Sequence, residues 1–161
     1  MKSKSVAIFA LTIFMLTFTL SCGKREKEMS LKIYDLVNLM PAGDSVVSDS
    51  IVSEVISFRK KGLEIICSQV VSPGKGNDSR YRLMVESVSE YLSEGGKEKS
   101  RVRWEKILVG NYEESVNIDL KNFFLEQLNV IGSDYYSIVT EKYLNNDMAD
   151  SDSGMVVFKV D

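Results

Sequence analysis

The chain has 161 residues, a formal net charge of −3 and a hydrophobic fraction of 44%, and it contains no histidine. This length and composition are those of one folded domain, and a mildly acidic balance gives no electrostatic reason to bind nucleic acid. The lack of histidine excludes Ser–His and Cys–His catalysis and histidine-ligated zinc. We therefore predict a non-enzymatic protein that uses no cofactor.

The first 22 residues have the pattern of an export signal. Lys2 and Lys4 are followed by an uncharged run, residues 6–20 (VAIFALTIFMLTFTL). This run has the length of a signal-peptide core and is shorter than the roughly 20 residues that a membrane-spanning helix needs. The small residue Ser21 and then Cys22 end the run, and the chain becomes polar directly afterwards. The pattern predicts a signal peptide that ends at Ser21.

This segment resembles a bacterial lipoprotein precursor, in which the chain is cut before a cysteine whose thiol carries a lipid. The motif Thr19-Leu20-Ser21-Cys22 is similar to the relaxed lipoboxes of spirochaetes and Bacteroidetes. The enterobacterial pattern differs, because it has leucine three positions and a small residue two positions before the cysteine. The resemblance implies that residues 1–21 are removed and that Cys22 is the site of lipid attachment. The alternative is a plain signal peptide or an uncleaved anchor with an incidental cysteine.

The resemblance also implies a place in the cell. Gly23 stands where an aspartate, in enterobacteria, indicates retention in the inner membrane, so the implied destination is the outer membrane of the cell envelope. Each buried CH₂ of an acyl chain contributes roughly 0.8 kcal/mol, so an anchor of several chains is stable. Residues 22–30 then form the lipidated end and a charged tether. Cys67 is left without a disulfide partner, and its apolar neighbours predict a buried thiol.

Two segments of the remaining chain have helical patterns. Residues 51–61 carry an apolar stripe at helical spacing, and Gly62 suits the position just after the helix. A second stripe covers residues 120–131, where Asp119 is placed to cap the first turn and Gly132 to end the last. These two segments are the predicted helices.

The other apolar segments are rich in β-branched residues or alternate between apolar and polar side chains, which is typical of strands. A turn cluster at residues 73–78 separates two of them. Residues 31–40 form a short apolar run that fits either a first strand or a helical turn. The predicted strands cover residues 63–72, 80–91, 101–109, 135–144 and 155–160.

These elements predict an α+β fold, with an antiparallel sheet of four to six strands and two helices packed on one face. The whole forms a single domain over residues 31–161. One segment has a second interpretation, because Tyr81, Val85, Val88 and Leu92 also follow helical spacing. The choice between strand and helix for residues 81–92 therefore stays open.

Two charged clusters are candidate sites. Asp147, Asp150 and Asp152 supply carboxylates at close spacing, as a calcium loop does, but the glycine needed for an EF-hand turn is misplaced. A solvated hairpin loop is the alternative that this spacing favours. The second cluster could contact anionic lipid headgroups or an acidic partner, or could simply be a solvated strand face. It consists of Lys97, Lys99, Arg101 and Arg103.

The sequence thus predicts an envelope lipoprotein, held to the membrane through Cys22, that acts as a binding or assembly module for another envelope protein or a host protein. A small carboxylate-dependent envelope hydrolase is one alternative, and its signature would be two facing carboxylates in a concave site. A carrier of apolar ligands is the other, and it would need a cavity of several hundred Å³.

Overall fold

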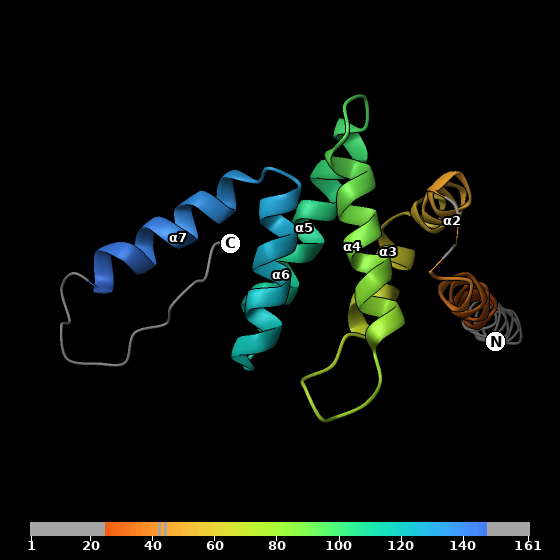
Figure 1. The fold of residues 1–161 in the computed structure, drawn as a ribbon, viewed down its shortest axis with the longest axis horizontal. Helices are drawn as coiled ribbons and strands as arrows, with labels where there is room; N and C mark the ends of the chain where they lie inside the picture. Colours follow the sequence, from red (N-terminus) through yellow and green to blue (C-terminus); the bar gives the residue numbers. More distant parts are fainter. Residues whose placement is uncertain (1–24, 42, 44, 148–161) are drawn as a thin grey trace, which may run out of the picture. The chain divides into compact units, whose positions relative to one another are not determined.

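The computed structural model describes residues 25–41, 43 and 45–147. Within these residues every regular element is a helix (Figure 1). None of the described helices is long and apolar enough to cross a membrane. One helix covers residues 25–38. The others are α2 (Ser45–Ser57), α3 (Arg59–Ser68), α4 (Ser79–Ser93), α5 (Glu98–Glu114), α6 (Ile118–Val130) and α7 (Asp134–Asp147).

The predicted α+β fold with an antiparallel sheet is wrong, because the described part of the chain forms no strand. Residues 63–72, predicted as a strand, lie in α3 and the turn after it. Leu63, Ile66 and Val70 are buried there, at the i, i+3 and i+7 positions of one helical face. β-branched residues favour strands only where a pleated surface gives them packing partners, and here a helical face buries the same side chains.

The strand predicted over residues 80–91 is wrong, and the helical alternative for residues 81–92 is the one found, since they lie in α4. Val85, Val88 and Leu92 are buried at the i, i+3 and i+7 positions, so the helical spacing of these residues marks the buried face of α4. The short run 31–40 is also helical for most of its length.

Two further strand predictions are wrong. Residues 101–109 lie inside α5, where Trp104, Ile107 and Leu108 are buried at i, i+3 and i+4. Residues 135–144 lie in α7. Their predicted hairpin partner, residues 155–160, is outside the described residues. Both errors arose from short apolar runs, for which the strand and helix patterns overlap.

The helix predicted over residues 120–131 is confirmed as α6. Its cap differs from the prediction: the Asn117 side chain accepts hydrogen bonds from the backbone N–H groups of Asp119 (3.0 Å) and Leu120 (3.1 Å). Asn is among the best N-cap residues, and Asp119 instead supplies a negative charge to the first turn. Gly132 follows the helix with a φ of 67°, which suits the predicted end.

The helix predicted over residues 51–61 is divided in two. α2 ends at Ser57 and α3 begins at Arg59. Arg59 has a φ of 58°, in the left-handed region that arginine rarely adopts. The chain changes direction at this residue. We call residues 57–61 the α2–α3 corner. Gly62, predicted as the helix end, is buried inside α3.

The helices form two compact units. The N-terminal unit contains the described residues up to Val70 together with Asn77–Ser87, and the C-terminal unit contains Val71–Gly76 and the described residues from Val88 onward. Each unit has its own buried apolar side chains. These include Ile33, Val37, Val52, Val55, Leu63, Ile66 and Met84 in the N-terminal unit and Leu92, Trp104, Leu108, Phe124 and Leu128 in the C-terminal unit.

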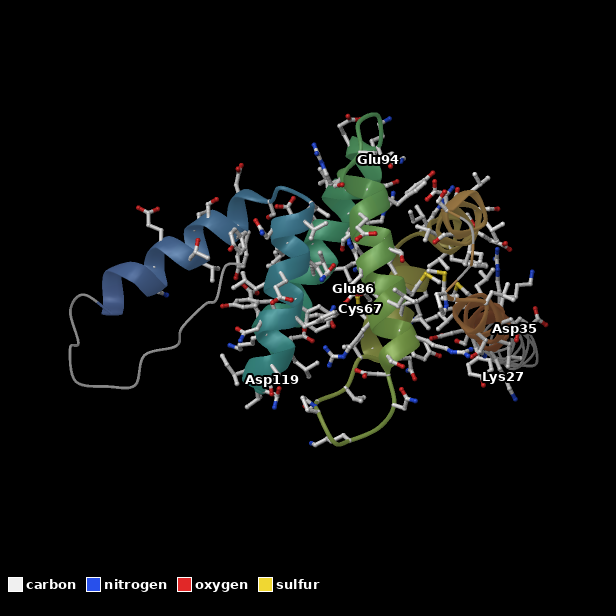
Figure 2. All side chains as sticks on the ribbon, viewed as in Figure 1. Lys27, Asp35, Cys67, Glu86, Glu94 and Asp119 are labelled. Atoms are coloured by element: carbon white, nitrogen blue, oxygen red, sulfur yellow. The ribbon has the colours of Figure 1, made fainter. Side chains whose placement is uncertain are left out.

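Cys67 is buried in α3, as its apolar neighbours predict (Figure 2). Burial raises the pKa of its thiol far above the usual value, and the charge of Glu64 raises it further. Because the thiolate is the reactive form, we expect Cys67 to resist an aromatic disulfide reagent in the native protein and to react once denaturant is added. Release of the coloured thiol product measures this. Rapid reaction of the native protein that disappears in Cys67→Ala would contradict the buried position.

Candidate functional site

A cleft of about 900 Å³ opens in the N-terminal unit, between the helix over residues 25–38 and the α2–α3 corner. Six of the nine lining residues are charged and two are apolar. The helix contributes Arg25, Glu26, Glu28, Met29 and Lys32, and the corner contributes Ser57, Phe58, Arg59 and Lys61.

The first wall follows from the periodicity of the helix over residues 25–38. Ile33 and Val37, one turn apart, are almost fully buried and fix which face of the helix meets the core. Arg25, Met29 and Lys32 stand at i, i+4 and i+7, so they form one row on the neighbouring face. Residues 25–30, predicted as part of a polar tether, are thus helical and contribute to this wall.

The second wall depends on the break between α2 and α3. If α2 and α3 formed one continuous helix, Arg59 and Lys61 would point in different directions from its axis. The left-handed conformation of Arg59 instead changes the direction of the chain between the two helices. A non-glycine residue in this region costs about 1–3 kcal/mol and persists only where its surroundings hold it. The corner therefore fixes two cationic side chains at the cleft at some cost in stability.

Gly62 lies where the α2–α3 corner packs against the helix over residues 25–38. A Cβ atom at this position would lie 2.4 Å from the Phe58 Cβ, 3.3 Å from the Val55 carbonyl oxygen and 3.4 Å from the Ile33 Cδ1. The missing side chain lets the corner close on itself and lets the helix that carries Ile33 approach it.

The charges of the cleft do not cancel. Lys61 Nζ and Glu26 Oε1 form an ion pair at 3.0 Å across the cleft, and both side chains are about half exposed, so the pair contributes at most about 1 kcal/mol. The lining contains four cationic and two anionic side chains. Within the described part of the chain, Arg25, Lys32 and Arg59 form no ion pair. These three groups are available to an anionic ligand, and Met29 and Phe58 offer apolar contact beside them.

The predicted basic cluster lies on α5 and is organised differently from a strand face. Lys97 is used within the protein: its Nζ donates to the Tyr91 carbonyl oxygen at 2.9 Å and to Glu94, and lies 3.5 Å from the centroid of the Tyr91 ring. Arg101 and Arg103, predicted to share one strand face, are two residues apart in a helix and point in different directions.

Lys99 and Arg103, one turn apart on α5, remain exposed or half-exposed cations. Glu98, at the start of this helix, accepts a hydrogen bond from the Gly96 N–H at 3.1 Å. Hydrogen bonds from its own backbone N–H and that of Gly96, with the charge of Arg101, hold the pKa of Glu98 below its usual value. The cluster is therefore the start of a helix, and Lys97 within it is held by internal partners.

The other predicted site residues fall at or beyond the limits of the described residues. Asp147 is the last residue of α7, and Asp150 and Asp152 lie outside the described residues, so the calcium loop stays a prediction. Among the described residues, no group of three or more Asp, Glu, Cys or His side chains is placed to hold a metal ion. Cys22 also lies outside the described residues.

A second cleft, of about 690 Å³, lies in the C-terminal unit. It contains one lysine and one glutamate, Lys75 and Glu114, and its other lining residues are neutral. Asn117, one of these residues, is already engaged in capping α6. This cleft therefore gives no indication of a ligand class.

One wall of the first cleft could have been predicted from the spacing of its residues, although their charged composition indicates a tether. The charges of residues 24–28 favour a solvated tether, yet the helical row Arg25, Met29 and Lys32 runs without interruption into the buried stripe of Ile33 and Val37. The left-handed Arg59 had no sequence signal, since this conformation is favoured by glycine and asparagine.

Comparisons of the chain with protein-family models, with curated proteins and with solved structures give no match. The functional argument therefore rests on the residues of this chain.

Proposed function

We propose that the protein is an envelope lipoprotein, anchored in the outer membrane through acyl chains on Cys22, whose helical domain is a non-enzymatic binding module for another envelope protein or a host protein. The observation that carries the proposal is Cys22 itself, which follows Thr19-Leu20-Ser21 at the end of the uncharged run 6–20.

The anchor would hold the first cleft close to the membrane. Arg25 is three positions after Cys22, and a fully extended chain covers at most about 3.6 Å per residue. Arg25 is therefore within about 11 Å of the lipidated residue, whatever conformation the intervening residues adopt. The headgroup layer on each side of a bilayer is roughly 5–8 Å thick, so this end of the cleft lies at or just above it.

The cleft favours a binding module over the two alternatives. A carboxylate-dependent hydrolase needs two facing carboxylates, whereas Glu26 and Glu28 belong to the same wall and Glu26 pairs with Lys61. A carrier of apolar ligands needs an enclosed pocket, whereas this cleft is open to solvent and six of its nine lining residues carry a charge at the end of an apolar stem. An anion is the ligand that suits such a lining.

Fatty-acid labelling tests the anchor. Cells that express the wild type or Cys22→Ala are given an alkyne fatty acid, and the purified protein is examined for the probe. We expect the wild type to carry the probe and Cys22→Ala to lose it, because the acyl chains need the cysteine at the cleavage site. Fractionation of the same cells shows whether the wild type is in the outer membrane.

Cys67→Ala is the matched control, since it removes the other cysteine of the chain and should keep the label. Equal labelling of the wild type and Cys22→Ala, or an unlabelled wild type, would contradict the proposed anchor.

A further inference from the structure

We propose that the first cleft binds the phosphate of anionic phospholipids in the same membrane that holds Cys22, so that the N-terminal unit lies with this cleft against the headgroups. The inference rests on the proposed lipid anchor. It adds a second membrane contact, which would orient the unit.

Reach is the first argument. Arg25 is within about 11 Å of Cys22, and a helix rises about 1.5 Å per residue, so the row from Arg25 to Lys32 adds about 10 Å. Every cationic group of this wall therefore lies within a short distance of the anchored residue. A short tether makes the second contact intramolecular, which gives the headgroups a high effective concentration at the cleft.

Charge is the second argument. Arg25, Lys32 and Arg59 line the cleft without an ion pair among the described residues. Arginine presents a planar fork of N–H donors that fits phosphate oxygens, and lysine adds a point charge. The cleft lining carries two more cationic than anionic side chains, although the chain as a whole is acidic.

The apolar side chains are the third argument. Met29 and Phe58 are both partly exposed in the cleft, beside the cationic groups. A phospholipid offers an anionic phosphate with a glycerol and acyl region directly beneath it, so one ligand satisfies both kinds of lining. A small inorganic anion would leave the two apolar side chains in water.

The test uses the lipidated full-length mature protein, with a nitroxide attached at Ser57→Cys. Ser57 is an exposed, neutral residue of the cleft, and the buried Cys67 does not compete for the label. The protein is reconstituted into vesicles of phosphatidylcholine alone or with added phosphatidylglycerol. Accessibility of the nitroxide to a neutral aqueous nickel chelate is measured by electron paramagnetic resonance. We expect accessibility to fall only when phosphatidylglycerol is present, and added salt should restore it.

Two matched double variants separate the cleft from general charge. Lys32→Gln with Arg59→Gln removes one lysine and one arginine from the cleft, and Lys99→Gln with Arg103→Gln removes the same charges from α5. Each cation near an anionic surface changes the binding equilibrium about fivefold, so the cleft variant should shift it about 25-fold toward the accessible state. The α5 variant should behave as the wild type. Equal effects of the two variants would overturn the assignment to the cleft.

The remaining outcomes are also decisive. Protein that fails to float with phosphatidylcholine vesicles would refute the anchor. Protein that floats but keeps the same accessibility in both vesicles would refute the cleft contact and leave the anchor intact. Inorganic phosphate at matched ionic strength should leave the protection in place, and full reversal by phosphate would show that the free anion is the ligand.

Discussion

Replacement of Trp104 by alanine is expected to lower the free energy of unfolding of the C-terminal unit by about 3–5 kcal/mol. Trp104 is fully buried in α5, and its indole Nε1 donates a hydrogen bond to the Ser89 Oγ at 3.0 Å. The substitution removes a large apolar volume and this buried hydrogen bond together. Since domains are stable by only about 5–15 kcal/mol, the loss should be visible as a much lower urea midpoint in circular dichroism.

Two further variants divide this effect into its parts. Trp104→Phe keeps much of the apolar volume and loses the hydrogen bond, so it should cost less than Trp104→Ala. Val102→Ala, on the same helix, truncates a side chain that is 48% exposed and should change stability by no more than about 0.5 kcal/mol. A urea midpoint of Trp104→Ala equal to that of Val102→Ala would contradict the position of Trp104 in the core.

Replacement of Gly62 by alanine is expected to destabilise the N-terminal unit by about 1–3 kcal/mol, although alanine is the better helix former. The added methyl group would meet the Phe58 Cβ at 2.4 Å. This atom is the stem of the Phe58 side chain and cannot move aside without the backbone. The clash therefore outweighs the gain in helix propensity of about 1 kcal/mol. Chemical denaturation of the full chain measures the net change.

Gly110→Ala is the matched control, because Gly110 is also inside a helix but has no atom within 4 Å of an added Cβ. Here the propensity gain acts alone, and we expect an increase in stability of about 0.5–1 kcal/mol. The two alanine substitutions should thus have opposite signs. A stabilising effect at both positions would show that Gly62 is not tightly packed against Phe58.

The sequence predicts the fold only where local signals agree. In α6 the polar cap, the apolar stripe and the final glycine all indicate a helix, and the helix is found. In α3 and α5 the helical spacing was present, but β-branched residues and short alternations favoured strands. Strand pairing depends on distant partners, so no local pattern could show that they were missing. The turn predicted at residues 73–78, by contrast, is confirmed, because glycine and proline act locally.

The candidate site was predictable to a smaller extent. The i, i+4, i+7 row of Arg25, Met29 and Lys32 can be read from the sequence once the segment is known to be helical. The facing wall cannot, because it depends on the left-handed Arg59 and on a contact between Gly62 and the distant Ile33. A site made by two segments more than twenty residues apart needs the tertiary structure.

Intact-mass spectrometry of the mature protein, purified from membranes in detergent, tests the central claim most directly. The account predicts a chain that begins at Cys22, carries the added mass of a lipid anchor, and loses only the part of that mass that belongs to ester-linked acyl groups when these are hydrolysed. A free thiol at Cys22, or a mature chain that begins at another residue, would contradict the anchor and, with it, the membrane-facing position of the cleft.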